Sequence, residues 1–357
     1  MKSSEPYEET SQYSYYTTDN LMLDLPEPCD VSNIQEFSKV FQPYVQSLVF
    51  LIGISGNTLV LMTYGFAKKI KSMTDIFLIN LAVADLLLLL TLPFMSVNAV
   101  KGWVFGNEMC KVVQGMYAIN FFSGFLFLTC ISVDRYFEIV RAVEALTMRQ
   151  RSICYSTVIT PVLWGASVLL SLPEFIYSES TMREEVYICK MIFPEHLTST
   201  VKSISNFSQI ILGFVLPFFV MVVCYSIIIR TLLTGRTFKK HKALKVIITV
   251  VVVFVIFQLP YTLVTFMETT DFLGSQQMSC EVRKSKDLAI IITSNLAFTR
   301  CCLNPIIYAF VGVKFRKEIF ILLKKFGCIS RATYVRCYGS RRDSHTSVMT
   351  DTSSFIL

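Results

Sequence analysis

Two pairs of oppositely charged residues lie in or beside long apolar stretches, where a charge is costly. Asp85 and Arg300 are each surrounded by apolar residues, and Asp134 and Arg135 end a long uncharged run. On insertion scales an unpaired charge at the centre of a bilayer costs at least about 2.5 kcal/mol. We therefore hypothesise that Arg300 pairs with Asp85, and that Asp134 holds Arg135 until a second conformation exposes it. The alternatives are that Arg300 extends toward water, and that Asp134-Arg135-Tyr136 is only an interfacial anchor.

The remaining polar residues do not favour catalysis. The three histidines, His196, His241 and His345, are far apart, and the sequence contains no phosphate-binding glycine loop, zinc-ligand spacing or nucleophile elbow. We expect neither an enzyme nor a cofactor. The net charge of +7 is compatible with nucleic-acid binding, but the basic residues gather in short segments between apolar runs. That distribution indicates membrane topology rather than a nucleic-acid partner.

Apolar runs long enough to cross a membrane organise the chain. Apolar residues make up 53% of the 357 residues, and charged residues 17%. A helix rises about 1.5 Å per residue and a hydrocarbon core is about 30 Å thick, so about 20 residues suffice. We predict an all-α membrane protein with seven spanning helices, over residues 41–66, 75–100, 110–135, 153–173, 200–230, 244–267 and 288–313. Pro217, Pro260 and Pro305 lie within three of them and predict kinks.

The distribution of charge between these runs predicts how the chain crosses the membrane. Lys and Arg gather after the first, third, fifth and seventh runs, for example at Lys68, Arg149 and Lys239. Cytoplasmic loops are enriched in these residues. Residues 1–30 contain seven carboxylates and one lysine. We expect an outside N-terminus, an inside C-terminus and no cleavable signal peptide, because the first apolar run begins only near residue 41.

Four of the eleven cysteines fall on the outer side. They are Cys29, Cys110, Cys189 and Cys280, and four cysteines allow three disulfide connectivities. Their positions favour Cys110–Cys189, between the third run and the second outer loop, and Cys29–Cys280, between the N-terminal segment and the last outer loop. The alternative, four free thiols, is disfavoured because thiols outside a cell oxidise.

The two ends of the chain differ in composition from the bundle at residues 41–313. Residues 1–40 form an acidic outer segment that cannot bury a core and suits a basic protein partner. Its tyrosines include Tyr7, Tyr13, Tyr15 and Tyr16. Residues 314–327 predict a short amphipathic eighth helix on the membrane lipid. Cys328 and Cys337, candidates for palmitoylation, begin a disordered tail, 328–357, that suits phosphorylation and arrestin binding. For either end, a merely solubilising segment is the alternative.

Short motifs within the predicted spans resemble those of the rhodopsin-like G-protein-coupled receptors. They are Gly56-Asn57, Leu81-Ala82-Val83-Ala84-Asp85, Asp134-Arg135-Tyr136, Trp164, Pro217, Pro260-Tyr261 and Asn304-Pro305-Ile306-Ile307-Tyr308. Within that family, Thr91-Leu92-Pro93, the pair Cys29 and Cys280, and the run His241-Lys242-Ala243-Leu244-Lys245-Val246 resemble chemokine receptors. The resemblance implies a rhodopsin-like bundle in the plasma membrane that binds a basic CC chemokine outside. Inside, it implies coupling to a heterotrimeric G protein, usually of the inhibitory class, in chemotaxis.

The resemblance also implies roles for individual residues. Asp134, Arg135 and Tyr136 would serve G-protein coupling. The activation core would comprise Asn57, Asp85, Gln258, Pro260, Arg300, Asn304, Pro305 and Tyr308. Chemokine binding would fall to Tyr7, Tyr13, Tyr15 and Tyr16, with sulfation of some of them, and to Tyr117, Phe121, Glu268 and Asp271. For the pocket residues, ordinary helix packing is the alternative.

The chain departs from the family pattern at several positions. Glu138 adds a carboxylate near the motif arginine, where a small residue is usual. Asp85 matches a position at which many relatives bind sodium, but Gly124 offers no hydroxyl there and Arg300 falls beside the same cavity. We hypothesise that the guanidinium replaces sodium. Further departures are Gln258, beneath the predicted ligand pocket, and Ser294, Met95 and Gln46 within it.

Two other functions remain open at this point. A transporter would also need broken helices and paired charges within the membrane, although we see no internal repeats in the seven runs. A scavenging receptor would internalise chemokine without G-protein signalling. The intact Asp134-Arg135-Tyr136 motif argues against scavenging, whereas Glu138 is compatible with it.

Overall fold

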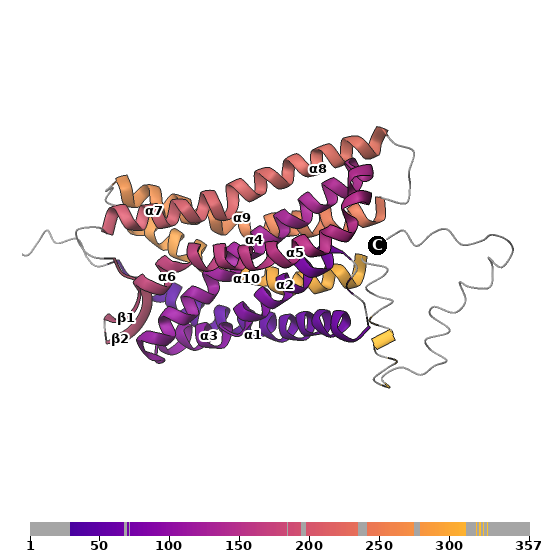
Figure 1. Ribbon diagram of the computed structural model, residues 1–357. Coiled ribbons are helices and arrows are strands. Elements are labelled where there is room, and N and C mark those ends of the chain that lie inside the picture. Colours follow the sequence, from indigo (N-terminus) through magenta and orange to yellow (C-terminus); the bar gives the residue numbers. More distant parts are fainter. Residues whose placement is uncertain are drawn as a thin grey trace, which may run out of the picture.

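Long helices form a bundle with a two-stranded hairpin at one end (Figure 1). The computed structural model describes residues 29–67, 70, 72–183, 185–193, 198–234, 241–274 and 279–311, and residues 319, 321, 322, 324 and 327. Within this part of the chain, seven helical segments are long and apolar enough to cross a membrane. The predicted all-α bundle of seven spanning helices is therefore confirmed. The predicted eighth helix, 314–327, lies largely outside the described residues.

Several spans consist of more than one helix. The first comprises α1 (Ser32–Met62) and the π-helical turn η2 (Thr63–Ala67), and the second comprises α2 (Met73–Leu89) and α3 (Leu92–Lys101). The third is the single helix α4 (Gly106–Val140), and the fourth comprises α5 (Ala142–Leu170) and α6 (Leu172–Tyr177). The fifth comprises α7 (Thr198–Ile210), the π-helical turn η3 (Ile211–Val215) and α8 (Leu216–Thr234). The sixth and seventh are α9 (His241–Gly274) and α10 (Cys280–Val311).

Prolines accompany three of these interruptions. Pro93 and Pro173 stand in the first turns of α3 and α6, where the N–H that a proline lacks would have no helical partner. Pro217 is the second residue of α8, which follows η3, and the wider π-helical turn gives its ring room beside the preceding carbonyls. Pro260 and Pro305 lie inside α9 and α10, within the spans that the sequence predicted for them.

Most helices extend beyond the apolar runs. The first helix begins at Ser32 rather than at residue 41, so it extends into the predicted N-terminal segment. Similarly, α4 covers Gly106–Val140 rather than 110–135, and α9 continues to Gly274 rather than ending at 267. Hydropathy marks only the part of a helix inside hydrocarbon, whereas backbone hydrogen bonding continues into the interfacial layers.

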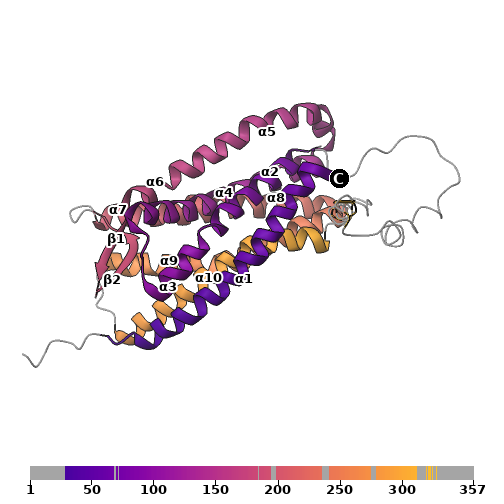
Figure 2. The same cartoon turned by 90° about the horizontal axis from the view of Figure 1, so that it is seen from below.

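The central helix of the bundle is α4. In the apolar stretch of α4 that could cross a membrane, 61% of the residues are buried inside the bundle. In the corresponding stretch of the fourth span, only 17% are buried. Accordingly, α5 lies at the edge of the bundle in Figure 2. Phe122, Phe125 and Phe127 of α4 are almost completely buried and belong to one core cluster with Met221 and Ile228 of α8. The charged and polar residues of α4 are therefore held by a tightly packed helix.

A hairpin lies between the fourth and fifth spans, at the end of the bundle that the charge distribution predicts to face outward (Figure 1). This end is called the outer end below, and the opposite end is called the inner end. Strands β1 (Ser178–Arg183) and β2 (Val186–Met191) pair antiparallel, with Ser178 opposite Met191. The Trp103 N–H donates to the Tyr187 carbonyl at 2.7 Å. Cys110 at the start of α4 is bonded to Cys189 in β2, with Cα atoms 5.6 Å apart.

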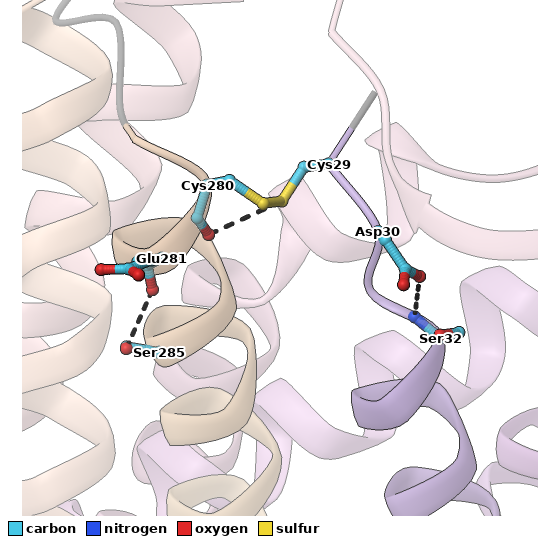
Figure 3. The surroundings of a disulfide bond; sticks show 6 residues. All are labelled: Cys29, Asp30, Ser32, Cys280, Glu281 and Ser285. Atoms are coloured by element: carbon cyan, nitrogen blue, oxygen red, sulfur yellow. Dashed lines mark hydrogen bonds between the residues drawn. A yellow bond between two sulfur atoms is a disulfide. The ribbon is translucent and has the colours of Figure 1, made fainter. Parts of the chain in front are cut away.

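A second disulfide joins the beginnings of α1 and α10. Cys29 precedes α1 and is bonded to Cys280, the first residue of α10, with Cα atoms 5.5 Å apart (Figure 3). Nearby, the Ser32 N–H donates to Asp30 Oδ1 at 3.0 Å, and this backbone hydrogen bond lowers the pKa of the Asp30 carboxyl. Both predicted pairings are therefore present, and together they bind three helices and the hairpin at the outer end.

Candidate functional site

Arg135 is buried at the inner end of α4 among carboxylates. Arg135 is 2% exposed, and its Nη2 lies 3.8 Å from Oδ2 of Asp134. Nη1 forms a closer ion pair and hydrogen bond with Glu138, one helical turn further along. Asp134 itself accepts a hydrogen bond from the Thr74 hydroxyl in α2. The arginine is thus held mainly by Glu138, while Asp134 also connects α4 to α2.

Two tyrosines and a serine lie near this arginine. The Ser132 hydroxyl, one turn before the motif, donates to the Tyr225 hydroxyl of α8 at 3.0 Å. Tyr136 is half-buried, packs against the core cluster around α4, and makes an edge contact with Phe137. The sequence did not indicate Thr74 or Tyr225, because a single hydroxyl in a membrane helix does not show which neighbouring helix its side chain faces.

A second polar cluster joins α2, α4 and α10 at mid-depth. Asp85 is completely buried and Arg300 is 3% exposed, with Nη1 of the arginine 3.8 Å from Oδ1 of the carboxylate. Asn120 of α4 lies between them: its amide nitrogen donates to Asp85 Oδ1 at 3.2 Å, and its oxygen accepts from the guanidinium. Asn304 donates to the other carboxylate oxygen at 2.9 Å. Asn120 was missed from the sequence, although it is a polar residue within an apolar run.

The same cluster continues into α1. The amide nitrogen of Asn57 donates to the carbonyl of Cys301 in α10 at 2.9 Å and to that of Gly53 at 3.0 Å. At Gly56 a Cβ atom would lie 2.9 Å from Cβ of Pro305, so the glycine allows α1 and α10 to approach closely. These contacts place Asn57 and Pro305 of the predicted activation core at one helix interface. The side chain of Tyr308 lies outside the described residues.

Aromatic side chains cover this cluster on its outer side. Tyr117 makes edge contacts with Tyr261 of α9 and Phe298 of α10, with ring centroids 6.4 and 5.7 Å apart. Phe121 stands one turn further in and is 4% exposed. Gln258 of α9 is 2% exposed, and its amide nitrogen has no hydrogen-bond partner among the described residues. Tyr117 and Phe121 therefore contribute to the packing between helices.

A polar triad occupies the outer part of the α1, α3 and α10 interface. Gln46 is 1% exposed, and its amide nitrogen donates to the Asn295 side chain at 3.2 Å. The Ser96 hydroxyl donates to the Gln46 oxygen at 2.8 Å. Gln46, one of the predicted departures from the family pattern, is thus a structural link between three helices.

The acidic residues predicted to meet a ligand differ in their surroundings. Glu268 is exposed on α9, whereas Asp271 forms an ion pair with Lys286 of α10. The structure adds a third carboxylate, Glu174 of α6, which is 8% exposed and whose Oε2 has no hydrogen-bond partner among the described residues. Sequence reasoning missed it, because a glutamate after a proline at the end of a span resembles an ordinary loop residue.

Other predicted site residues lie outside the described part of the chain. They are Tyr7, Tyr13, Tyr15 and Tyr16 in the N-terminal segment, and Cys328 and Cys337 in the tail. Within the described residues, no group of three or more His, Cys, Asp or Glu side chains is arranged to hold a metal ion.

Comparison with known proteins identifies the family. The model of the 7 transmembrane receptor (rhodopsin family) matches residues 56–308. The chain is 42% identical over 307 residues to C-C chemokine receptor type 9 of Homo sapiens, covering 86% of this chain and 83% of that protein. It is 42% identical over 332 residues to C-C chemokine receptor type 10 of Mus musculus, covering 92% of this chain and 91% of that protein.

A third relative extends the match over more of the chain. The sequence is 40% identical over 348 residues to C-C chemokine receptor type 7 of Homo sapiens, covering 95% of this chain and 91% of that protein. These matches confirm the resemblance that the motifs indicated, and they place the chain among receptors rather than enzymes. The chain belongs to the rhodopsin family of seven-transmembrane receptors and, within it, to the C-C chemokine receptors.

Proposed function

We propose that this chain is a plasma-membrane receptor that binds a basic CC chemokine on its outer side and activates a heterotrimeric G protein of the inhibitory class on its inner side. Its N-terminus is extracellular, and its cellular output is chemotaxis. The observation that carries the proposal is Arg135, a charged residue buried at the inner end of the central helix and held there by Glu138 and Asp134. Burying a charge is costly, so a conformation that releases it to a partner is accessible.

Contacts between the helices support a connection from the outer end to Arg135. Tyr117 touches α9 and α10, and the cluster of Asp85, Asn120 and Arg300 below it joins α2, α4 and α10. A ligand that displaces the outer ends of α9 and α10 would change these contacts. Pro260 interrupts hydrogen bonding within α9, so the inner half of that helix can move separately.

The outer side offers negative charge to a basic ligand. Residues 1–30 contain seven carboxylates, and Glu268 is exposed on α9. Opposite charges raise the rate of encounter and orient the partners. The carboxylate of Glu174 is buried on α6, which packs against α4, so we include it in the candidate chemokine pocket. Tyr7, Tyr13, Tyr15 and Tyr16, sulfated in part, would extend the negative surface.

The inner side would serve three further partners. The serines and threonines of residues 328–357 would recruit arrestin after phosphorylation. Residues 314–327 would lie on anionic membrane lipid, and palmitoylation of Cys328 or Cys337 would anchor them further. These proposals rest on sequence composition and on the family.

The proposal is tested in cells that express the full chain. We would measure inhibition of cyclic AMP formation by a panel of purified CC chemokines, with surface expression measured in parallel. We expect one or two chemokines to act, and Arg135→Ala to abolish the response while chemokine binding persists. A response that persists in Arg135→Ala would contradict the coupling role of Arg135.

The same assay distinguishes a signalling receptor from a scavenging receptor. Uptake of a fluorescent chemokine without any change in cyclic AMP would indicate a scavenging receptor. That outcome would be consistent with an arginine held permanently by Glu138. Binding of no CC chemokine would contradict the proposed ligand class.

A further inference from the structure

The buried cluster around Asp85 contains its own positive charge. Asp85 is 0% exposed and Arg300 is 3% exposed, and Nη1 of the guanidinium lies 3.8 Å from Oδ1 of the carboxylate. A buried carboxylate needs a compensating charge or a proton, because burial removes the water that would stabilise the ion. Three sources are available in general: a bound proton, a free cation or a fixed side chain. Here a fixed side chain stands beside the carboxylate.

Residues of α4 leave room for the guanidinium of Arg300 and form a hydrogen bond with it. Gly124 of α4 faces it, and a Cβ atom at this position would lie 3.0 Å from Nη1 of Arg300. Asn120, one turn earlier on α4, accepts a hydrogen bond from Nη2 and donates one to Asp85. Asn304 satisfies the second carboxylate oxygen. A glycine and an asparagine on one face of α4 therefore leave room for the planar guanidinium and accept a hydrogen bond from it.

We propose that Arg300 is the resident counter-cation of Asp85 and occupies the space that a free monovalent cation would need. The receptor core then takes no sodium ion, because a second positive charge next to the guanidinium would be repelled in a poorly screened interior. Removing the guanidinium would leave a space lined by carboxylate and amide oxygens, the ligands that hard cations prefer. Arg300→Ser should therefore create a sodium site that the native chain lacks.

The first experiment measures sodium dependence without a ligand or a G protein. The full chain is purified in nanodiscs, and its thermal midpoint is recorded in sodium chloride and in choline chloride at equal ionic strength. We expect equal midpoints for the native chain and a sodium-specific rise for Arg300→Ser. That rise should disappear in Asp85→Asn/Arg300→Ser. A sodium-specific rise in the native chain that Asp85→Asn removes, or no rise in Arg300→Ser, would overturn the proposal.

Neutralising one charge or both charges tests the charge compensation itself. Arg300→Gln leaves Asp85 uncompensated, and we expect the thermal midpoint to fall on the order of 5–10 °C in choline chloride. Asp85→Asn/Arg300→Gln removes both charges and should be more stable than Arg300→Gln alone. Arg283→Gln, at an exposed arginine at the outer end of α10, is the matched control and should change little. A double variant no more stable than Arg300→Gln would refute the ion pair.

This inference goes beyond the proposed function and does not depend on it. The readout is thermal stability, so the experiment gives the same answer whether the receptor signals or only internalises its ligand.

Discussion

Arg135 is held by two carboxylates of its own helix, and their contacts differ. Asp134 lies 3.8 Å away and is also engaged by Thr74, whereas Glu138 makes the closer contact. The side chain of Glu138 is 39% exposed, so solvent screens part of the attraction between its carboxylate and Arg135. We therefore expect Glu138 to restrain Arg135, because its charge stabilises the buried position of the arginine relative to an exposed one.

Neutralising Glu138 should raise signalling without ligand. In Glu138→Gln the arginine loses its closest charged partner, and a change of about 0.5–1 kcal/mol shifts a two-state equilibrium roughly two- to fivefold toward the released state. The measurement is chemokine-independent inhibition of cyclic AMP formation at matched surface expression. Glu108→Gln, an exposed glutamate at the outer end of the same helix, is the control. Unchanged basal signalling in Glu138→Gln would refute the restraint.

Gly124 should be intolerant of a methyl group because Arg300 fills the space beside it. A Cβ atom would lie 3.0 Å from the guanidinium nitrogen, and overpacking of this kind costs about 1–3 kcal/mol. We expect a lower thermal midpoint for Gly124→Ala, and a smaller loss when Arg300→Gln is added. Gly165→Ala, which meets nothing within 4 Å, should be neutral or stabilising. Equal effects at the two glycines would contradict this account.

At the scale of elements, the two disulfides fix how the helices meet at the outer end. Cys29–Cys280 joins the beginnings of α1 and α10, which also approach closely at Gly56 and Pro305. Cys110–Cys189 attaches the hairpin to α4. The inner half of the bundle has no comparable covalent link among the described residues, so rearrangement on activation is expected there.

Removing the Cys29–Cys280 bond should destabilise the outer end. A disulfide contributes about 2–4 kcal/mol, partly by restricting the unfolded chain, and this one spans 251 residues. Cys29→Ser and Cys280→Ser should each lower the thermal midpoint, and the double variant should equal the single ones, since all three break one bond. Cys154→Ser, at an exposed free cysteine, is the control. Additive losses would show that the two cysteines act separately.

Some of these elements could be predicted from the sequence because they have a distinct hydropathy pattern, whereas others have none. Seven apolar runs predicted seven spans, because crossing hydrocarbon requires a long apolar helix. The runs did not reveal that new helices begin at Leu92 and Leu172. Nor did they reveal that residues 178–183 and 186–191 pair as strands, since a short strand pair has no hydropathy signature. The sequence predicts the pairing of Asp85 with Arg300, because a charge within apolar residues is conspicuous. Asn120 and Thr74 were missed because their partners depend on helix rotation.

For the whole molecule, the charge distribution predicts one orientation in the membrane. Basic residues follow the odd-numbered spans, and residues 1–30 are acidic. An epitope tag at the N-terminus should be accessible to antibody on intact cells, and a tag at the C-terminus only after permeabilisation. The opposite pattern would contradict both the orientation and the proposed site of chemokine binding.

The central claim is that chemokine binding at the outer end releases Arg135 to a G protein at the inner end. The most direct test is guanine-nucleotide exchange on a purified inhibitory G protein, with the full chain in nanodiscs and a chemokine that binds it. We predict that the chemokine accelerates exchange on the native receptor, and that Arg135→Ala binds the chemokine without accelerating exchange. Chemokine binding to the native chain without any acceleration, or acceleration that survives in Arg135→Ala, would contradict the account.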